Sequence, residues 1–199
     1  MYTLINGSGK LKNSNSEYFL RYISNGLEKC NYFNLRNSNY KEIILSIKKS
    51  DSIVLAFPLY ADSPSSLTLS LLDYLYDSKI DINANLYVII NCGFREPEHN
   101  ITALNIIKNW CKKMNISFYG SVLIGTGEVA GDSKYRFISK KIFKDLDDLK
   151  YCIKNNEKMG DRIHTVSLLN NFMFCTIAKH NWNKQAKTNH LKVKDIKRK

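Results

Sequence analysis

The hydrophobic positions of the chain fall into short continuous runs separated by segments in which apolar residues recur at helical spacing. Two of the runs, 52–57 and 86–90, are apolar throughout and rich in isoleucine, valine and leucine. Runs of this kind are typical of strands that are buried on both faces of a parallel sheet. In all, the pattern predicts five strands, at residues 3–6, 30–35, 52–57, 86–90 and 118–124.

The segments between these runs predict helices. In the first of them an apolar stripe of Tyr18, Phe19 and Tyr22 follows a cluster of serine and asparagine residues that are good helix caps. Asn39, followed three residues later by Glu42, fits a capping box at the start of the second helix. The predicted helices span about 15–29, 40–47, 65–77, 98–114, 135–155 and 161–187, and no strand is predicted after residue 124.

Strands that alternate with helices predict right-handed crossovers and a parallel sheet with helices on both faces. We therefore expect an α/β fold in a single domain. Residues 1–130 form its core, and residues 131–199 form a helical extension that ends in a lysine-rich tail from Lys184 to Lys199.

Composition narrows the class of protein. A chain of 199 residues is long enough to bury a core without metals or disulfides. Its five cysteines show no C-x-x-C spacing, which argues against a structural zinc site or an Fe–S cluster, and their odd number fits reduced thiols. No run approaches the roughly 20 apolar residues of a bilayer span. Since Met1 leads directly into a strand pattern, we expect a cytoplasmic protein.

The formal net charge is +12, which is high for a chain of this length. Such a charge attracts anionic cofactors, nucleic acid or acidic membrane surfaces. Charge alone does not choose among these partners.

The loop after the first strand, Asn6–Ser16, has the composition of an anion site. It brings hydroxyl groups, lysines and backbone N–H groups to the start of the first helix, where the helix dipole also favours an anion. The probable anion is a phosphate group, and the alternative is an ordinary, well-capped turn. Three further loops follow the strands that end at 57, 90 and 124. Because parallel strands end at the same edge of a sheet, we expect all four loops to meet there.

These loops resemble those of a known family. Asn6-Gly7-Ser8-Gly9-Lys10-Leu11-Lys12-Asn13-Ser14-Asn15-Ser16 resembles the phosphate loop of the flavodoxin-like NAD(P)H-dependent FMN oxidoreductases, also called the NADPH-dependent FMN reductase family. Phe57-Pro58-Leu59-Tyr60-Ala61-Asp62-Ser63 resembles their second flavin loop, and the stretch from Asn91 to Glu96 resembles their third. The motifs occur in the right order over about residues 1–130. Gly9 departs from the pattern, since the family usually has proline there.

The resemblance implies a five-stranded sheet in flavodoxin order, 2-1-3-4-5, with FMN at the strand ends. It implies that Ser8, Lys10, Ser14, Asn15 and Ser16 hold the phosphate. It further implies that Pro58, Leu59, Tyr60, Asp62 and Ser63 line the isoalloxazine ring, with Asn91, Cys92, Gly93 and Phe94 at its other border. For Cys92, a simple packing role is the favoured interpretation over a redox role.

The function that the resemblance implies is FMN-dependent transfer of reducing equivalents from NADPH or NADH to a quinone, a nitro or azo compound, or free flavin. The nicotinamide cofactor visits transiently, the flavin carries the chemistry without a dedicated catalytic residue, and a homodimer is expected.

Two alternatives stay open. The first is a flavodoxin-type electron carrier, although such carriers are usually acidic and this chain is basic. The second is a flavin-fold scaffold whose basic tail binds nucleic acid or an anionic membrane, to which an amphipathic helix over 161–187 could also contribute.

Overall fold

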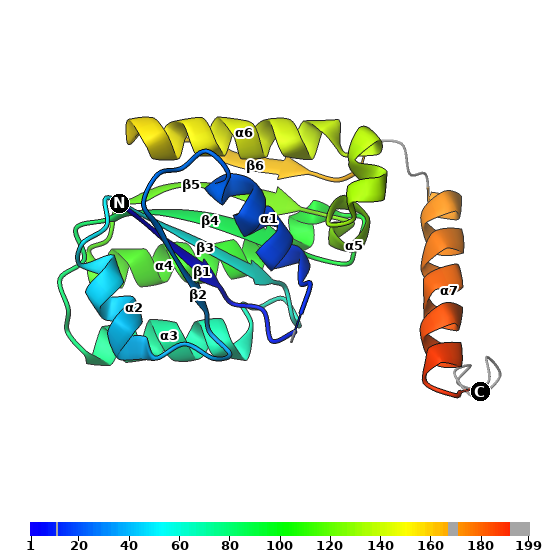
Figure 1. Ribbon diagram of the computed structural model, residues 1–199, viewed down its shortest axis with the longest axis horizontal. Helices are drawn as coiled ribbons and strands as arrows, with labels where there is room; N and C mark the ends of the chain where they lie inside the picture. The colour runs from blue at the N-terminus through cyan, green and yellow to red at the C-terminus, as the bar shows by residue number, and fades with distance from the viewer. Residues whose placement is uncertain (11, 167–170, 192–199) are drawn as a thin grey trace. The chain divides into compact units, whose positions relative to one another are not determined.

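The structure is a computed structural model that describes residues 1–10, 12–166 and 171–191 (Figure 1). The chain divides into two compact units, Met1–Val166 and Ser167–Lys199. The first unit contains the sheet. Of the second unit, the structure describes the helix α7 (Asn171–Thr188), which includes the start of the predicted basic tail. Residues 192–199 of that tail lie outside the described part of the chain.

The first unit is a sheet whose strands alternate with helices for most of its length. Its strands are β1 (Tyr2–Asn6), β2 (Cys30–Asn34), β3 (Ser52–Pro58), β4 (Asn85–Asn91), β5 (Phe118–Ile124) and β6 (Asp161–His164). Its α-helices are α1 (Asn15–Ser24), α2 (Tyr40–Ile47), α3 (Ser66–Asp77), α4 (Asn100–Met114), α5 (Gly127–Ala130) and α6 (Lys140–Asn155), with short 3-10 helices η1 (Pro97–His99) and η2 (Ser133–Ile138).

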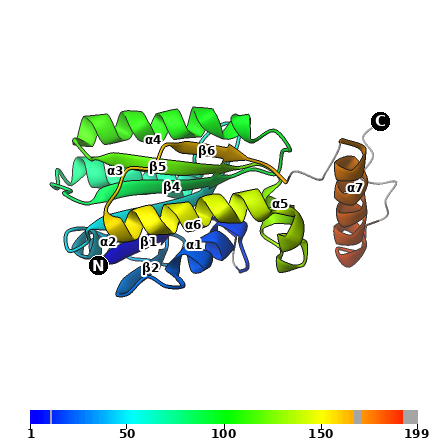
Figure 2. The same cartoon turned by 90° about the horizontal axis from the view of Figure 1, so that it is seen from above.

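The strands form one parallel sheet in the order β2-β1-β3-β4-β5-β6. Figures 1 and 2 show α1 and α6 on one face of this sheet and α2, α3 and α4 on the other. All strand arrows point to the same edge, near α5 (Figure 1). The first five strands have the order 2-1-3-4-5 that is typical of flavodoxin-like folds, as expected. The carboxyl ends of β1, β3, β4 and β5 therefore lie along one edge.

The two predicted apolar runs form the centre of the sheet. Every residue of β4 is buried, as is every residue of β3 except Pro58. From α1, Phe19, Leu20 and Ile23 are fully buried, which agrees with the predicted stripe. Burial of such side chains contributes roughly 1.5–3 kcal/mol each. The core thus holds α1 and the central strands in a fixed arrangement.

The helix starts follow local capping. Ser14 caps α1 by accepting a hydrogen bond from the Glu17 amide at 3.1 Å, and Asn39 caps α2 in the same way through the Lys41 amide at 2.9 Å. Ser65 caps α3, as predicted. The first helix ends at Ser24, five residues before the predicted end, because Gly26 with φ of +99° and Lys29 with φ of +55° turn the chain toward β2.

The prediction of five strands was wrong, since the sheet has six. Asp161–His164 was expected to begin a long helix and instead pairs with β5 as an edge strand. Its sequence, Asp-Arg-Ile-His, has a single apolar residue and carries no strand signal. Contacts distant in sequence hold it: Asp161 accepts hydrogen bonds from Ser121 at 2.7 Å and from Lys108, and His164 contacts Asp145 of α6.

The sixth strand also changes the expected extension. Residues 131–166 pack with the sheet in the first unit, whereas the predicted extension contained helices alone. The predicted helix over 161–187 is reduced to α7, and its segment 167–170 lies outside the described residues. No helix in the described ranges combines the length and the apolar character needed to cross a membrane.

Gly7, at the end of β1, offers a test of this packing. A Cβ atom there would lie 2.1 Å from Thr68 Oγ1 and 3.0 Å from the Phe57 Cβ, whereas one at Gly9 would meet nothing within 4 Å. We expect Gly7→Ala to lower the free energy of unfolding by about 1–3 kcal/mol, and Gly9→Ala to change it by less than about 0.5 kcal/mol. Urea denaturation measures both, and equal stabilities would contradict the packing described.

Candidate functional site

The loop after β1 is fixed by the side chain of Asn6, which is fully buried at the strand end. Its Oδ1 accepts a hydrogen bond from the Ser8 amide at 3.0 Å, and its Nδ2 donates to Ser14 Oγ at 3.4 Å. The Ser8 hydroxyl in turn accepts from the Lys10 amide at 3.3 Å. One side chain therefore holds both ends of the loop in which a phosphate site was predicted.

Asn91, at the end of β4, joins this loop to the next two strands. Its Nδ2 donates to Ser16 Oγ at 2.8 Å and to the Phe57 carbonyl at 3.2 Å, and its carbonyl accepts from the Leu59 amide at 2.8 Å. The loops after β1, β3 and β4 are thus brought together, as the parallel topology predicts.

The β3 loop contains a tight turn. Tyr60 and Ser63 exchange two backbone hydrogen bonds of 3.0 Å, and Ala61 and Asp62 between them have φ of +47° and +57°. These dihedrals are those of a type I′ turn, in which residues other than glycine and asparagine are uncommon. The turn leaves Tyr60 54% exposed at the strand edge.

The β4 loop carries a second exposed ring, Phe94, which is 56% exposed. The ring centroid of Phe94 lies 4.6 Å from that of His99, and His99 Nδ1 lies 4.0 Å from Asp62 Oδ1 in the β3 loop. The carbonyls of Phe94 and Cys92 accept hydrogen bonds from the Thr126 and Gly127 amides of the β5 loop. Two large exposed rings thus stand on neighbouring loops of one connected frame.

Cys92 is 4% exposed, and its thiol is directed to the carbonyls of Phe94 and Glu96. Burial raises the pKa of this thiol above its ordinary value. A raised pKa keeps the sulfur protonated and poorly nucleophilic near neutral pH. The structure therefore agrees with a packing role for Cys92.

The charges around the β1 loop are unevenly distributed. A cavity of about 480 Å³ beside the start of α1 is lined by Ser14 and Asn15 on one side and by Glu128 and Asp132 on the other. On the side of β2, Arg36 Nη1 donates to the Gly9 carbonyl at 2.7 Å. A phosphate is repelled by the two carboxylates and attracted by the cations, so the favourable side is that of Lys10 and Arg36.

Arg36 was missed in the sequence, although a signal existed. It follows the end of β2, and in a parallel sheet the loop after β2 lies beside the loop after β1. A cation directly after a predicted strand next to a phosphate loop is therefore a candidate ligand by topology alone.

The residues predicted from the sequence lie in three environments. Ser8, Ser14, Ser16, Asn91 and Cys92 are buried, Asn15, Pro58, Leu59 and Ser63 are half-buried, and Lys10, Tyr60, Asp62, Gly93 and Phe94 are exposed. The hydroxyls of Ser14 and Ser16 already take part in hydrogen bonds within the protein. These two serines position the loop, and the groups that remain open to a ligand are concentrated at Lys10, Tyr60 and Phe94.

The donor set fits FMN. Hydroxyl groups, cations and the amides of the first turn of α1 suit a phosphate, because those amides have no partner within the helix. The exposed rings of Tyr60 and Phe94 suit a flat ring system attached to it.

Comparisons with known proteins support the fold. No family model matches the chain, and no curated protein matches its sequence. Among solved structures, the Trp repressor binding protein from Bacillus subtilis is 18% identical, with a TM-score of 0.58 over 71% of this chain and 97% of that one.

Two further solved structures are similar. An NADPH-quinone reductase from P. pentosaceus is 12% identical, with a TM-score of 0.62, and an FMN-dependent NADH-azoreductase from Bacillus anthracis, in complex with FMN, is 11% identical, with a TM-score of 0.56. Each match covers 75% of this chain and 97% of the other. At these identities the comparisons establish a flavodoxin-like fold, and the structural neighbours that share it are reductases.

Tyr60 provides a direct test of the site. We expect Tyr60→Ala to weaken FMN binding about tenfold, because loss of one aromatic stacking surface costs roughly 0.5–1.5 kcal/mol beyond the buried area. Tyr76, which is 53% exposed near the end of α3 at the opposite edge of the sheet, is the matched control. Quenching of FMN fluorescence measures both affinities, and an unchanged affinity in Tyr60→Ala would remove this residue from the site.

Proposed function

We propose that the protein is an FMN-dependent NAD(P)H oxidoreductase that passes reducing equivalents to a small acceptor such as a quinone, a nitro or azo compound, or free flavin. The observation that carries this proposal is the connected frame at one sheet edge, with a phosphate-type loop and two exposed rings. The fold shared with quinone and azo reductases supports it.

In this proposal Ser8, Lys10 and Arg36 bind the FMN phosphate, with the amides of Asn15 and Ser16 at the start of α1. Charge-assisted hydrogen bonds to a phosphate are the strong ones in proteins, each contributing roughly 1.5–3 kcal/mol. Asn6 and Asn91 position these groups without contacting the ligand.

Tyr60 and Phe94 are proposed to flank the ring from the β3 and β4 loops, near Pro58, Leu59, Asp62, Ser63, Asn91, Cys92 and Gly93. When bound, FMN supplies two-electron chemistry between a nicotinamide cofactor and the acceptor. The chain contributes binding and orientation, and the open edge beside Tyr60 and Phe94 admits donor and acceptor in turn.

Further parts of the proposal concern partners and location. The resemblance implies a homodimer, which sedimentation would show. The five free cysteines fit a reducing compartment, and we place the protein in the cytoplasm.

The decisive experiment is anaerobic addition of NADPH, and separately NADH, to the FMN-loaded protein. We expect the visible flavin absorbance to bleach much faster than that of free FMN at the same concentration, and to return on addition of a quinone. Bound flavin that neither nucleotide bleaches would favour the electron carrier instead. A protein that cannot be loaded with FMN would contradict the proposal altogether.

A further inference from the structure

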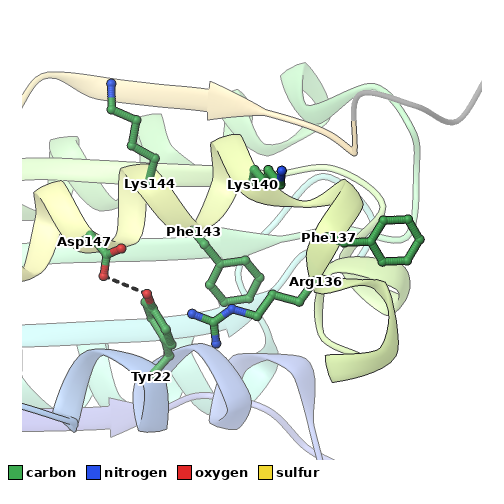
Figure 3. Close-up of a pocket in the computed structure, with 7 residues that line it drawn as sticks. All are labelled: Tyr22, Arg136, Phe137, Lys140, Phe143, Lys144 and Asp147. Carbon is green, nitrogen blue, oxygen red and sulfur yellow. Dashed lines mark hydrogen bonds between the residues drawn. The ribbon is translucent and has the colours of Figure 1, made fainter.

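A second cavity, of about 360 Å³, lies between α1, η2 and α6 (Figure 3). Its lining residues are Tyr22, Arg136, Phe137, Lys140, Phe143, Lys144 and Asp147. None of them belongs to the proposed flavin site. The cavity is therefore a separate feature that the proposed reaction does not use.

The cavity has an aromatic floor on which an arginine is held. The rings of Tyr22 and Phe143 meet edge to face, with centroids 4.9 Å apart. The Arg136 guanidinium carbon lies 4.4 Å from the Phe143 centroid and 4.7 Å from that of Tyr22, and Figure 3 shows this group directed toward the two rings. Cation–π contacts of this kind restrict an otherwise flexible side chain. Arg136 is therefore oriented before any ligand arrives.

The cations of this cavity lack anionic partners. Asp147, the carboxylate among the lining residues, accepts a hydrogen bond from the Tyr22 hydroxyl at 2.7 Å and lies 3.6 Å from Lys150 Nζ. Burial, together with the bond to Asp147, raises the pKa of Tyr22, so its hydroxyl remains a donor.

Within the described part of the chain, no ion pair within 4 Å involves Arg136, Lys140 or Lys144. Three like charges around one cavity repel one another, and an anion placed among them would relieve that repulsion.

We infer that this cavity binds a nucleotide-like anion, meaning a planar ring joined to phosphate groups. A guanidinium group pairs with phosphate and stacks on flat rings, and Lys140 and Lys144 add charge beside it. Phe137, which is 66% exposed, offers a further ring at the rim. The volume lies in the range of small-molecule sites. An acidic peptide would satisfy the cations but leave the rings without a matching surface.

Titration calorimetry of the full chain with ADP tests this inference, at low salt and with saturating FMN so that the flavin site is filled. We expect saturable binding of ADP, at least about tenfold tighter than that of pyrophosphate, which lacks the ring, or adenosine, which lacks the phosphates. A parallel titration without FMN gives a readout that does not depend on the proposed function.

Arg136→Gln should weaken ADP binding about tenfold or more, and Arg136→Lys, which keeps the charge but not the planar group, should weaken it less. Arg162→Gln is the matched control, because Arg162 is exposed on β6, outside the cavity, and the charge change is the same. Unchanged melting temperatures show that the variants fold.

Three results would overturn the inference. They are the absence of saturable ADP binding, equal losses in Arg136→Gln and Arg162→Gln, and binding of a single-stranded oligonucleotide without binding of ADP. Each would show that the cations act through general charge or serve another partner.

Discussion

The candidate site depends on the hydrogen bonds of one buried amide, Asn91. Its side chain connects Ser16 in α1 with the carbonyl of Phe57 at the end of β3, and its own carbonyl holds Leu59. A buried amide that lost these partners would leave several polar groups unsatisfied, at a cost of roughly 1–3 kcal/mol each. The loops after β1, β3 and β4 therefore form one frame, and Tyr60 and Phe94 are displayed from a fixed base.

This frame explains why the binding groups are divided between buried and exposed residues. Ser14 and Ser16 spend their hydrogen bonds on the protein, so that the amides and cations around them face outward in a set geometry. Pre-organisation of this kind lowers the cost of ordering the loop on binding. The same principle applies at the second cavity, where the rings of Tyr22 and Phe143 orient Arg136.

The sequence was informative where local physics decides structure. The apolar runs at 52–57 and 86–90 formed β3 and β4, and the caps at Asn39 and Ser65 start helices as predicted. The sixth strand could not be predicted, because Asp161–His164 is polar and depends on partners at Lys108, Ser121 and Asp145, which are distant in sequence.

The site shows the same division. Its loops follow from the parallel topology, and the quoted motifs already pointed to them. The contact of Arg36 with Gly9, and the carboxylates of Glu128 and Asp132 beside α1, depend on how separate loops pack. Such neighbours decide on which side of the loop a phosphate is favourable, and no local pattern in the sequence contains them.

The central claim is that the loop from Gly7 to Ser16 recognises a phosphate. Riboflavin has the same ring and ribityl chain as FMN but lacks the phosphate, so a fluorescence titration with both ligands isolates this contribution. We predict that FMN binds at least about a hundredfold more tightly than riboflavin, as expected for two or more charge-assisted hydrogen bonds. Equal affinities for FMN and riboflavin would contradict the account.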